Sequence, residues 1–386
     1  MIKKIYKHIF IQSAGLFLGL IAMLLGLGFR TVKQNDQTII LQDEPIRTKN
    51  RAYFIAEVKD GRLEKGKVAS LINAVISANK ITATKEQADL MGGTATAVKQ
   101  FINHNLPQNV KGHAIVAEIK ELRVTETALP NNRVQGRVNI AMSFSLKYNE
   151  DITTHLVDYH STATYNRPLN VVAIGTAEPM LRHTIENAFV YFDSWISIQA
   201  NDNPKLAKGV RVTFSDFIER DKPQDDTVYY SPSRPLTWND FRDHPHSTRF
   251  TAEVLPGFGY SENAEVENGV IKVHLAMKVY LPKSSCWVRD GGMSDYSLNH
   301  EQRHFDIVKL VSEHFKEKIA ALKLPVYNYE GPVNVQYFES FREMDQLQKQ
   351  YDNETGHGLN EGAQQRWNER IDKELRKYGL IPGGQI

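Results

Sequence analysis

The chain has 386 residues, of which 41% are hydrophobic and 24% are charged, and its formal net charge is +2 at pH 7. This is the composition of a globular protein, and the length is enough for two domains of ordinary size. The near-neutral charge, with no basic stripe that carries interleaved aromatic residues, excludes a dedicated nucleic-acid surface, so we expect no nucleic-acid partner.

The N-terminal segment has the composition of an anchor or an export sequence. Lysines at positions 3, 4 and 7 precede an apolar run over residues 9–29, which is about the length that spans a bilayer. The lysines orient the N-terminus toward the cytoplasm, so the remainder would lie outside it. We predict that residues 1–30 are a signal anchor or, with Gly26 and Gly28 before the cleavage site, a signal peptide. The predicted location is the cell envelope, with membrane attachment through this segment, or outside the cell if the leader is cleaved.

Residues 31–50 are polar and are predicted to be a linker, and residues 51–220 are predicted to form an accessory α+β domain with an antiparallel sheet. Its expected strands are 52–58, 113–124, 133–148 and 153–165, and its expected helices are 67–81, 94–105 and 184–198. No catalytic pattern appears there. Its histidines are scattered, and we interpret them as structural: His104, His113, His155, His160 and His183.

A charged, proline-containing stretch at 221–226 marks the predicted boundary, and residues 227–386 form the second predicted domain. Strands are expected at 249–261 and 270–281, followed by helices at 298–322, 335–351 and 361–378. Apolar and polar residues alternate along 270–281, which predicts one buried face. Cys286 is the only cysteine, which excludes an internal disulfide, and we interpret it as a structural strand residue. The predicted fold class is α+β throughout, with a small sheet and three helices in the second domain.

The helix expected at 298–322 begins with His300-Glu301-Gln302-Arg303-His304. Positions i and i+4 of a helix differ by about 40° in azimuth, so His300 and His304 point the same way and can bind one Zn²⁺ ion. Glu301 is offset by about 100° from His300, from where its carboxylate can reach a water on the metal without being a ligand. The pattern predicts a zinc site in which Glu301 is the catalytic residue.

A third protein ligand is needed if the fourth position of the zinc is to hold water. The best candidate is His357, because the glycines on both sides of it let the backbone place this side chain at close quarters. Glu339 or Glu343 on the next helix is the runner-up, and Asp352 is a weaker alternative. His314 is expected to be solvated.

Two further residues near the motif have less certain roles. Asp306 either orients a ligand histidine by accepting its other ring proton or is a solvated helix charge. Tyr351 is a weak candidate for stabilising an oxyanion.

Residues 236–241, 285–288 and 298–307, which include the string His300-Glu301-Gln302-Arg303-His304-Phe305-Asp306, resemble a bacterial family of predicted secreted zinc-dependent proteases of unknown function. The segment from Tyr351 to Gly358 also resembles the distal element of that family. The resemblance covers about residues 230–375. It implies a zincin-like metallopeptidase domain with His300 and His304 as ligands and Glu301 as the catalytic residue, and it supports His357 as the third ligand.

The sequence therefore predicts a zinc metallopeptidase of the cell envelope that acts on a peptide or protein substrate. Two alternatives remain open. One is a zinc amidase that acts on cell-wall material, in which the same ligands would serve. The other is a non-catalytic metal-binding envelope protein, in which the zinc would have no open coordination position. The oligomeric state does not follow from the sequence.

Overall fold

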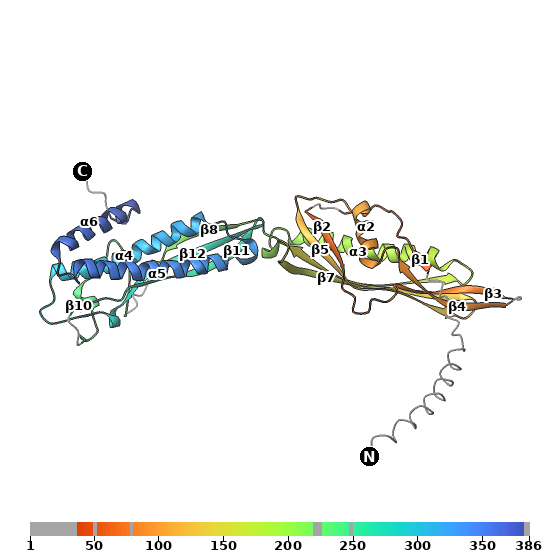
Figure 1. Ribbon diagram of the computed structural model, residues 1–386, viewed down its shortest axis with the longest axis horizontal. Helices are drawn as coiled ribbons and strands as arrows, with labels where there is room; N and C mark the ends of the chain where they lie inside the picture. The colour runs from red at the N-terminus through yellow and green to blue at the C-terminus, as the bar shows by residue number, and fades with distance from the viewer. Residues whose placement is uncertain (1–36, 49–51, 78–79, 219–225, 247–249, 382–386) are drawn as a thin grey trace, which may run out of the picture. The chain divides into compact units, whose positions relative to one another are not determined.

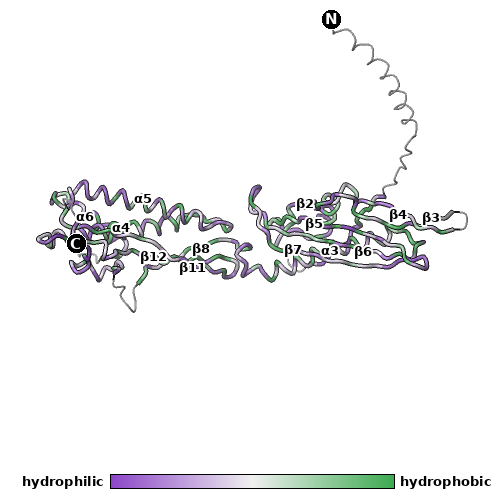
Figure 2. The backbone as a smooth tube through the Cα atoms, turned by 90° about the horizontal axis from the view of Figure 1, so that it is seen from below, coloured by the Kyte–Doolittle hydropathy of each residue, from purple (hydrophilic) through white to green (hydrophobic). Residues whose placement is uncertain are grey.

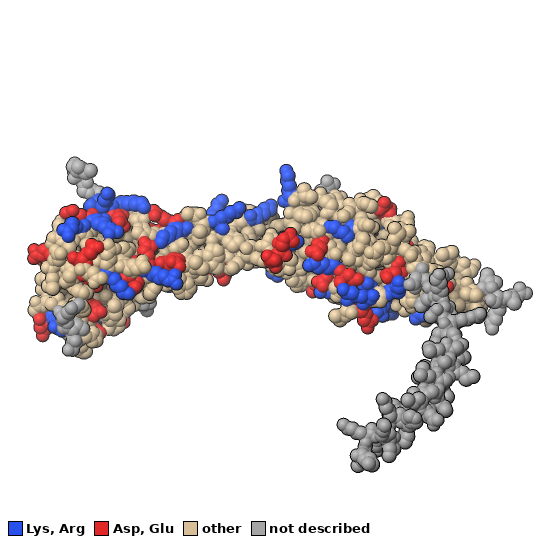
Figure 3. Space-filling model, in the orientation of Figure 1, with Lys and Arg blue, Asp and Glu red and all other residues tan. Residues whose placement is uncertain are grey.

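The computed structural model describes residues 37–48, 52–77, 80–218, 226–246 and 250–381. The chain divides into two compact units, an N-terminal unit of residues 1–194 and a C-terminal unit of residues 195–386. Both units combine helices with sheet (Figure 1), so the predicted α+β class is confirmed. In both, acidic and basic side chains are intermingled on the face drawn in Figure 3.

The N-terminal unit is built on a seven-stranded sheet with the order β1-β4-β3-β5-β6-β7, in which β2 also pairs with β5. Its strands are β1 (Gln37–Ile39), β2 (Tyr53–Asp60), β3 (Ala69–Ser77), β4 (Lys80–Leu90), β5 (His113–Leu129), β6 (Arg133–Lys147) and β7 (Thr153–Pro168). The long β5-β6-β7 meander is antiparallel, as predicted, whereas β1-β4, β2-β5 and β3-β5 are parallel pairs. The sheet is therefore mixed rather than purely antiparallel.

Helices α2 (Thr94–Asn105) and α3 (Ala173–Gln199) complete this unit. Alternate residues of β6 are buried, which is the pattern of a strand with one face on the core. From that face Phe144 stacks on Phe192 of α3, with ring centroids 4.4 Å apart, and meets Phe189 of the same helix edge to face at 5.6 Å. These aromatic contacts hold α3 against the sheet.

The prediction of a helix at 67–81 is wrong, because the described residues of this stretch form β3 and the start of β4. Leu71 and Ile72 are both buried although they point to opposite faces of the strand. A strand buried on both faces loses the alternation of apolar and polar residues, and its apolar spacing then resembles that of a helix. Pairing with β4 along the whole length of β3, from Ala69↔Ala88 to Ser77↔Lys80, stabilises the strand instead.

The C-terminal unit has a four-stranded sheet with the order β11-β12-β8, in which β9 also pairs with β12, and a separate β10-β13 ribbon. Its strands are β8 (Val210–Asp216), β9 (Thr227–Tyr229), β10 (Ala252–Glu253), β11 (Gly257–Glu267), β12 (Val270–Pro282) and β13 (Trp287–Val288), and its long helices are α4 (Asp295–Ala321), α5 (Glu330–Thr355) and α6 (Glu361–Lys377). The predicted alternation along β12 is confirmed, since Ile271, Val273, Leu275, Met277 and Val279 are all buried.

The core of the C-terminal unit lies between this sheet and α4. Phe305, Val308 and Val311 of α4 belong to the same buried cluster as the inward-facing residues of β12. Helix α5 is mostly hydrophilic along its length (Figure 2), and few of its residues are buried. Cys286 is fully buried, and this burial raises the pKa of its thiol to about 12.

The division between the units lies earlier than the sequence predicted. The units divide at residues 194 and 195, inside α3, rather than at 221–226. The reason is β8, which lies before the charged stretch but pairs in parallel with β12 from Ile271↔Val210 to Met277↔Asp216. A strand whose partner residues lie 61 positions further along the chain leaves no local pattern, so its membership of the second unit follows from the tertiary fold alone.

The predicted membrane attachment is not supported and is corrected here. None of the helices in the described residues combines the length and the apolar character needed to cross a membrane. The anchor or signal peptide predicted at 1–30 lies outside the described residues. Of the linker predicted at 31–50, residues 37–39 form β1, which pairs in parallel with β4.

Candidate metal centre

The two histidines of the motif lie in the second and third turns of α4. This helix begins at Asp295, where the side chain of Ser294 caps it by accepting a hydrogen bond from the backbone N–H of Ser297 at 3.1 Å. His300 and His304 are both buried, and their ring centroids lie 5.0 Å apart. The rest of α4 packs into the core of the unit, so the histidines project from a rigid element.

Two glutamines orient the imidazole rings. The Nδ1 atom of His300 lies 2.9 Å from Gln364 Oε1, and the Nδ1 atom of His304 contacts Gln348 Oε1. The amide nitrogens of both glutamines donate elsewhere, from Gln364 to the Tyr351 hydroxyl at 2.6 Å and from Gln348 to the His304 carbonyl at 3.2 Å. Each glutamine therefore presents its oxygen to a ring, which makes Nδ1 the donor and leaves the lone pair of Nε2 free for a ligand.

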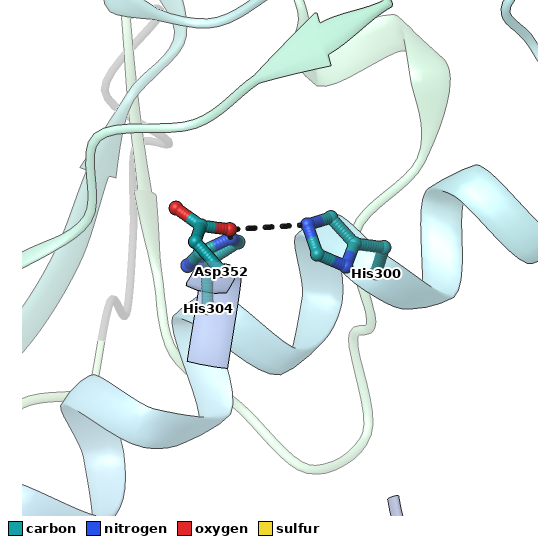
Figure 4. A group of neighbouring side chains, drawn as sticks. All are labelled: His300, His304 and Asp352. Carbon is teal, nitrogen blue, oxygen red and sulfur yellow. Dashed lines mark ion pairs between the residues drawn. The ribbon is translucent and has the colours of Figure 1, made fainter. Parts of the chain in front are cut away.

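Both Nε2 atoms face one carboxylate oxygen. Asp352, near the end of α5, places Oδ1 at 3.0 Å from His304 Nε2 and 3.4 Å from His300 Nε2 (Figure 4). This oxygen is buried and accepts no hydrogen bond within the described residues. The ligand atoms of the three residues all lie within 4.8 Å of one another. Two nitrogen lone pairs and an orphaned carboxylate oxygen repel one another unless a positive charge lies between them, so this cluster fits a metal ion.

The charges of the cluster are strongly coupled. Burial by itself raises the pKa of Asp352, but the two histidines outweigh it and hold that pKa well below its ordinary range. Burial lowers the pKa of His304, but Asp352 and Glu301 reverse this, so without an ion the ring can hold a second proton on Nε2, and a bound metal ion would take the place of that proton. The carboxylate is therefore ionised, as a metal ligand must be.

Glu301 is buried beside the cluster, with 5% of its surface exposed. Within the described residues its carboxylate makes neither a hydrogen bond nor an ion pair, although the side chains around it are closely packed. Burial raises the pKa of Glu301, and the histidines on either side offset only part of this shift. A carboxylate with a raised pKa next to a metal site is suited to accept a proton.

His357 lies beside the cluster, in a left-handed turn that ends α5. It has φ 56°, between Gly356 at 58° and Gly358 at 82°. Its Nδ1 atom is 3.5 Å from Asp352 Oδ1, its side chain is 34% exposed, and its ring packs against Phe250 with centroids 4.3 Å apart. Its role as third ligand stays a prediction.

Of the alternatives to His357, only Asp352 belongs to the cluster. Glu339 pairs with the exposed Arg342, and Glu343 binds His314 at 2.7 Å and Lys318 at 2.5 Å. His314 is therefore a salt-bridge partner rather than a freely solvated residue.

The sequence of this region is related to that of a known family. Residues 231–358 match the family described as "Bacterial protein of unknown function (DUF922)". The DUF922 match contains every member of the cluster, together with Glu301 and His357. No curated protein matches the chain.

Two solved structures are similar to parts of the chain. One is the crystal structure of protein XCC0632 from Xanthomonas campestris, described with the family DUF330, which is 8% identical with a TM-score of 0.27 and covers 42% of this chain and 95% of that one. The other is an uncharacterized protein, 6% identical with a TM-score of 0.20, which covers 43% of this chain and 99% of that one. At these scores neither similarity bears on function.

The structure also corrects two expectations within the DUF922 match. Asp306 does not orient a ligand histidine and is not solvated, because it is buried and accepts hydrogen bonds from Tyr230, Gln302 and Arg303. Tyr351 is fully buried, and its hydroxyl donates to the His300 carbonyl at 3.2 Å, so it supports the α4 backbone.

Gln348 and Gln364, which orient the histidine rings, were not predicted from the sequence. Gln348 lies one helical turn before Asp352, and that i to i+4 spacing is a readable signal once Asp352 is taken as a ligand. Gln364 lies outside the DUF922 match, on α6, and no local pattern connects it to His300.

Proposed function

We propose that the C-terminal unit is a zinc-dependent hydrolase that cleaves peptide bonds in a peptide or protein substrate. The observation that carries the proposal is the convergence of His300 Nε2 and His304 Nε2 on Asp352 Oδ1, beside the buried, unpaired carboxylate of Glu301. Two imidazoles and a carboxylate are the ligand set of many catalytic zinc sites, and three protein ligands leave a coordination position open.

The residues around the cluster have separable roles in this proposal. His300, His304 and Asp352 would hold the ion, with Gln364 and Gln348 fixing the tautomer of the two rings. When bound, zinc supplies Lewis acidity, which polarises the scissile carbonyl and makes water more acidic. Glu301 accepts the proton of the attacking water and passes it to the leaving amine, which a buried carboxylate of raised pKa can do in both directions.

A peptidase is favoured over a structural zinc site by the position of Glu301. A purely structural site uses four protein ligands and needs no adjacent base. Here the described cluster has three members, and a buried carboxylate follows the first of them directly in the chain. A zinc amidase would use the same residues, so substrate comparison, rather than the site itself, separates those two activities.

The test compares zinc occupancy with turnover in Glu301→Gln. Gln keeps the size and helix preference of Glu but removes the base, so zinc should still bind while hydrolysis falls by about 10²–10⁴-fold. The matched control is Glu265→Gln, which removes an exposed carboxylate of β11 and should change neither quantity. Zinc content is measured by mass spectrometry, and hydrolysis on a mixed peptide library and on peptidoglycan fragments.

Each outcome of that comparison is informative. Retained turnover in Glu301→Gln would assign the base to another residue. Loss of zinc would make Glu301 a ligand. Cleavage of peptidoglycan fragments alone would favour the amidase, and zinc binding with no hydrolysis of either substrate class would contradict the enzymatic proposal.

A further inference from the structure

A further carboxylate, Glu253, is held rigidly beside the cluster. It lies on β10, which contacts α4 and pairs antiparallel with β13 through Glu253↔Trp287. The indole Nε1 of Trp287 donates to Glu253 Oε2 at 3.0 Å, and Trp287 is 1% exposed. A buried indole is a fixed donor, so the Glu253 carboxylate has little rotational freedom.

The Glu253 charge is not neutralised by its partner. An indole is an uncharged donor, so the carboxylate keeps its full negative charge while one oxygen is occupied. The side chain is half-buried, so the carboxylate remains partly open to solvent. The strand lies by the cluster, because Phe250, three residues before Glu253, packs against His357 with ring centroids 4.3 Å apart, and His357 Nδ1 lies 3.5 Å from Asp352 Oδ1.

The site has an excess of negative charge. Glu301, Asp352 and Glu253 carry three formal negative charges, and a divalent ion offsets two of them. The neighbouring Arg303 does not supply the missing charge, because its guanidinium is bound by Asp306 at 3.0 Å and by Asp372 at 2.6 Å. The Glu301 carboxylate is itself buried, and none of the ion pairs among the described residues includes it.

We propose that Glu253 forms a subsite for a positively charged group of the substrate next to the bond that is cleaved. The group is an ammonium, supplied either by the free α-amine of a peptide or by a lysine side chain. The inference rests on the proposed function, because it assigns a substrate class to the same site. A half-buried, rigidly held carboxylate recognises an ammonium by charge-assisted hydrogen bonding, and it disfavours acidic groups at the same position.

The test measures binding to the zinc-loaded full-length chain, so it does not require turnover. Hydroxamates chelate zinc, and three of them form two matched pairs that share Nα-acetyl-norleucine hydroxamate. Nα-acetyl-lysine hydroxamate against Nα-acetyl-norleucine hydroxamate tests a side-chain ammonium, and norleucine hydroxamate with a free against an acetylated amine tests an α-ammonium. In at least one pair the cationic member should bind about fivefold more tightly by calorimetry. Glu253→Gln should abolish that preference, whereas Glu265→Gln should retain it.

The comparison stays valid if a variant is partly destabilised, because the preference is a ratio measured within one protein. Gln at position 253 also keeps an oxygen that can accept from the Trp287 indole. Equal binding within both pairs, or a preference that persists in Glu253→Gln, would overturn the subsite while leaving the zinc hydrolase intact. If none of the three hydroxamates binds, the open coordination position is absent, and the proposed function fails together with the subsite.

Discussion

At the scale of single residues, the orientation of the two ligand histidines is set by hydrogen bonds to Gln364 and Gln348, which are not themselves ligands in the proposed site. The motif residues His300, Glu301 and His304 are readable in the sequence because helical geometry alone places them together. Gln348 and Gln364 are not readable in the same way. They act through an amide oxygen, which any exposed glutamine also offers, and their partners lie 44 and 64 positions away in the chain.

The first prediction at this scale concerns which residue is the third metal ligand. The structure brings Asp352 into the cluster, whereas the sequence pattern favours His357. We expect Asp352→Ala to lower zinc affinity by more than about 100-fold, because it removes a ligand atom rather than an outer hydrogen bond. We expect His357→Ala to lower it less, and His314→Ala to leave it unchanged. Competition with a chromogenic chelator measures all three.

The reverse order would revise the site. A large loss of zinc in His357→Ala with little change in Asp352→Ala would restore the ligand set expected from the sequence. Equal large losses would make both residues ligands, and would then close the coordination position that hydrolysis requires.

At the scale of elements, the C-terminal helices were predictable and the strands of the N-terminal unit were only partly so. Helices α4 and α6 have long apolar stripes whose spacing fits one structure only. In contrast, β3 is buried on both faces, so its spacing fits a helix as well as a strand. The pairing with β4 that decides between them is a tertiary contact.

Outside the cluster, an ion pair joins helices α4 and α5. It should make the free energy of unfolding depend on pH. The hydrogen bond from His314, supplemented by Lys318, lowers the pKa of Glu343 from 4.5 to about 2. A carboxylate whose pKa is depressed by folding contributes stability above its unfolded pKa, and this contribution is lost as the pH falls toward the folded value. Glu343→Gln should therefore lower the free energy of unfolding by about 1 kcal/mol at pH 5 to 6, after allowance for solvent screening, and by little at pH 2.

Chemical denaturation at several pH values measures this difference. Glu339→Gln on the same helix is the control, because its pair with Arg342 is exposed on both sides and should contribute almost nothing. A constant difference between wild type and Glu343→Gln from pH 6 to pH 2 would show that the pair has no electrostatic role.

At the scale of the whole molecule, the sequence predicts two domains but not where they divide. The charged stretch at 221–226 is a plausible linker, yet β8 before it belongs to the second sheet. All residues of the candidate metal centre lie in the C-terminal unit, so zinc should stabilise that unit alone. A ligand that binds only the folded state at 1,000 times its dissociation constant adds about 4 kcal/mol.

Hydrogen exchange in the presence and absence of zinc tests this linkage. Protection should increase in peptides from α4 and α5, remain unchanged in peptides from β5, β6 and β7, and fail to respond in a His300→Ala, His304→Ala double variant. A zinc-dependent increase that survives in the double variant would place the metal elsewhere in the chain.

The turn that ends α5 also has a consequence for the free energy of metal capture. Gly356 adopts the left-handed conformation, and the N–H of His357 donates to the carbonyl of Asp352 at 2.9 Å. The backbone of Asp352, the proposed third ligand, is therefore immobilised by folding, before any ion arrives. Its loss of conformational entropy is already complete at that stage, so little reorganisation opposes binding. Capture should then be limited by removal of water from the ion rather than by movement of the chain.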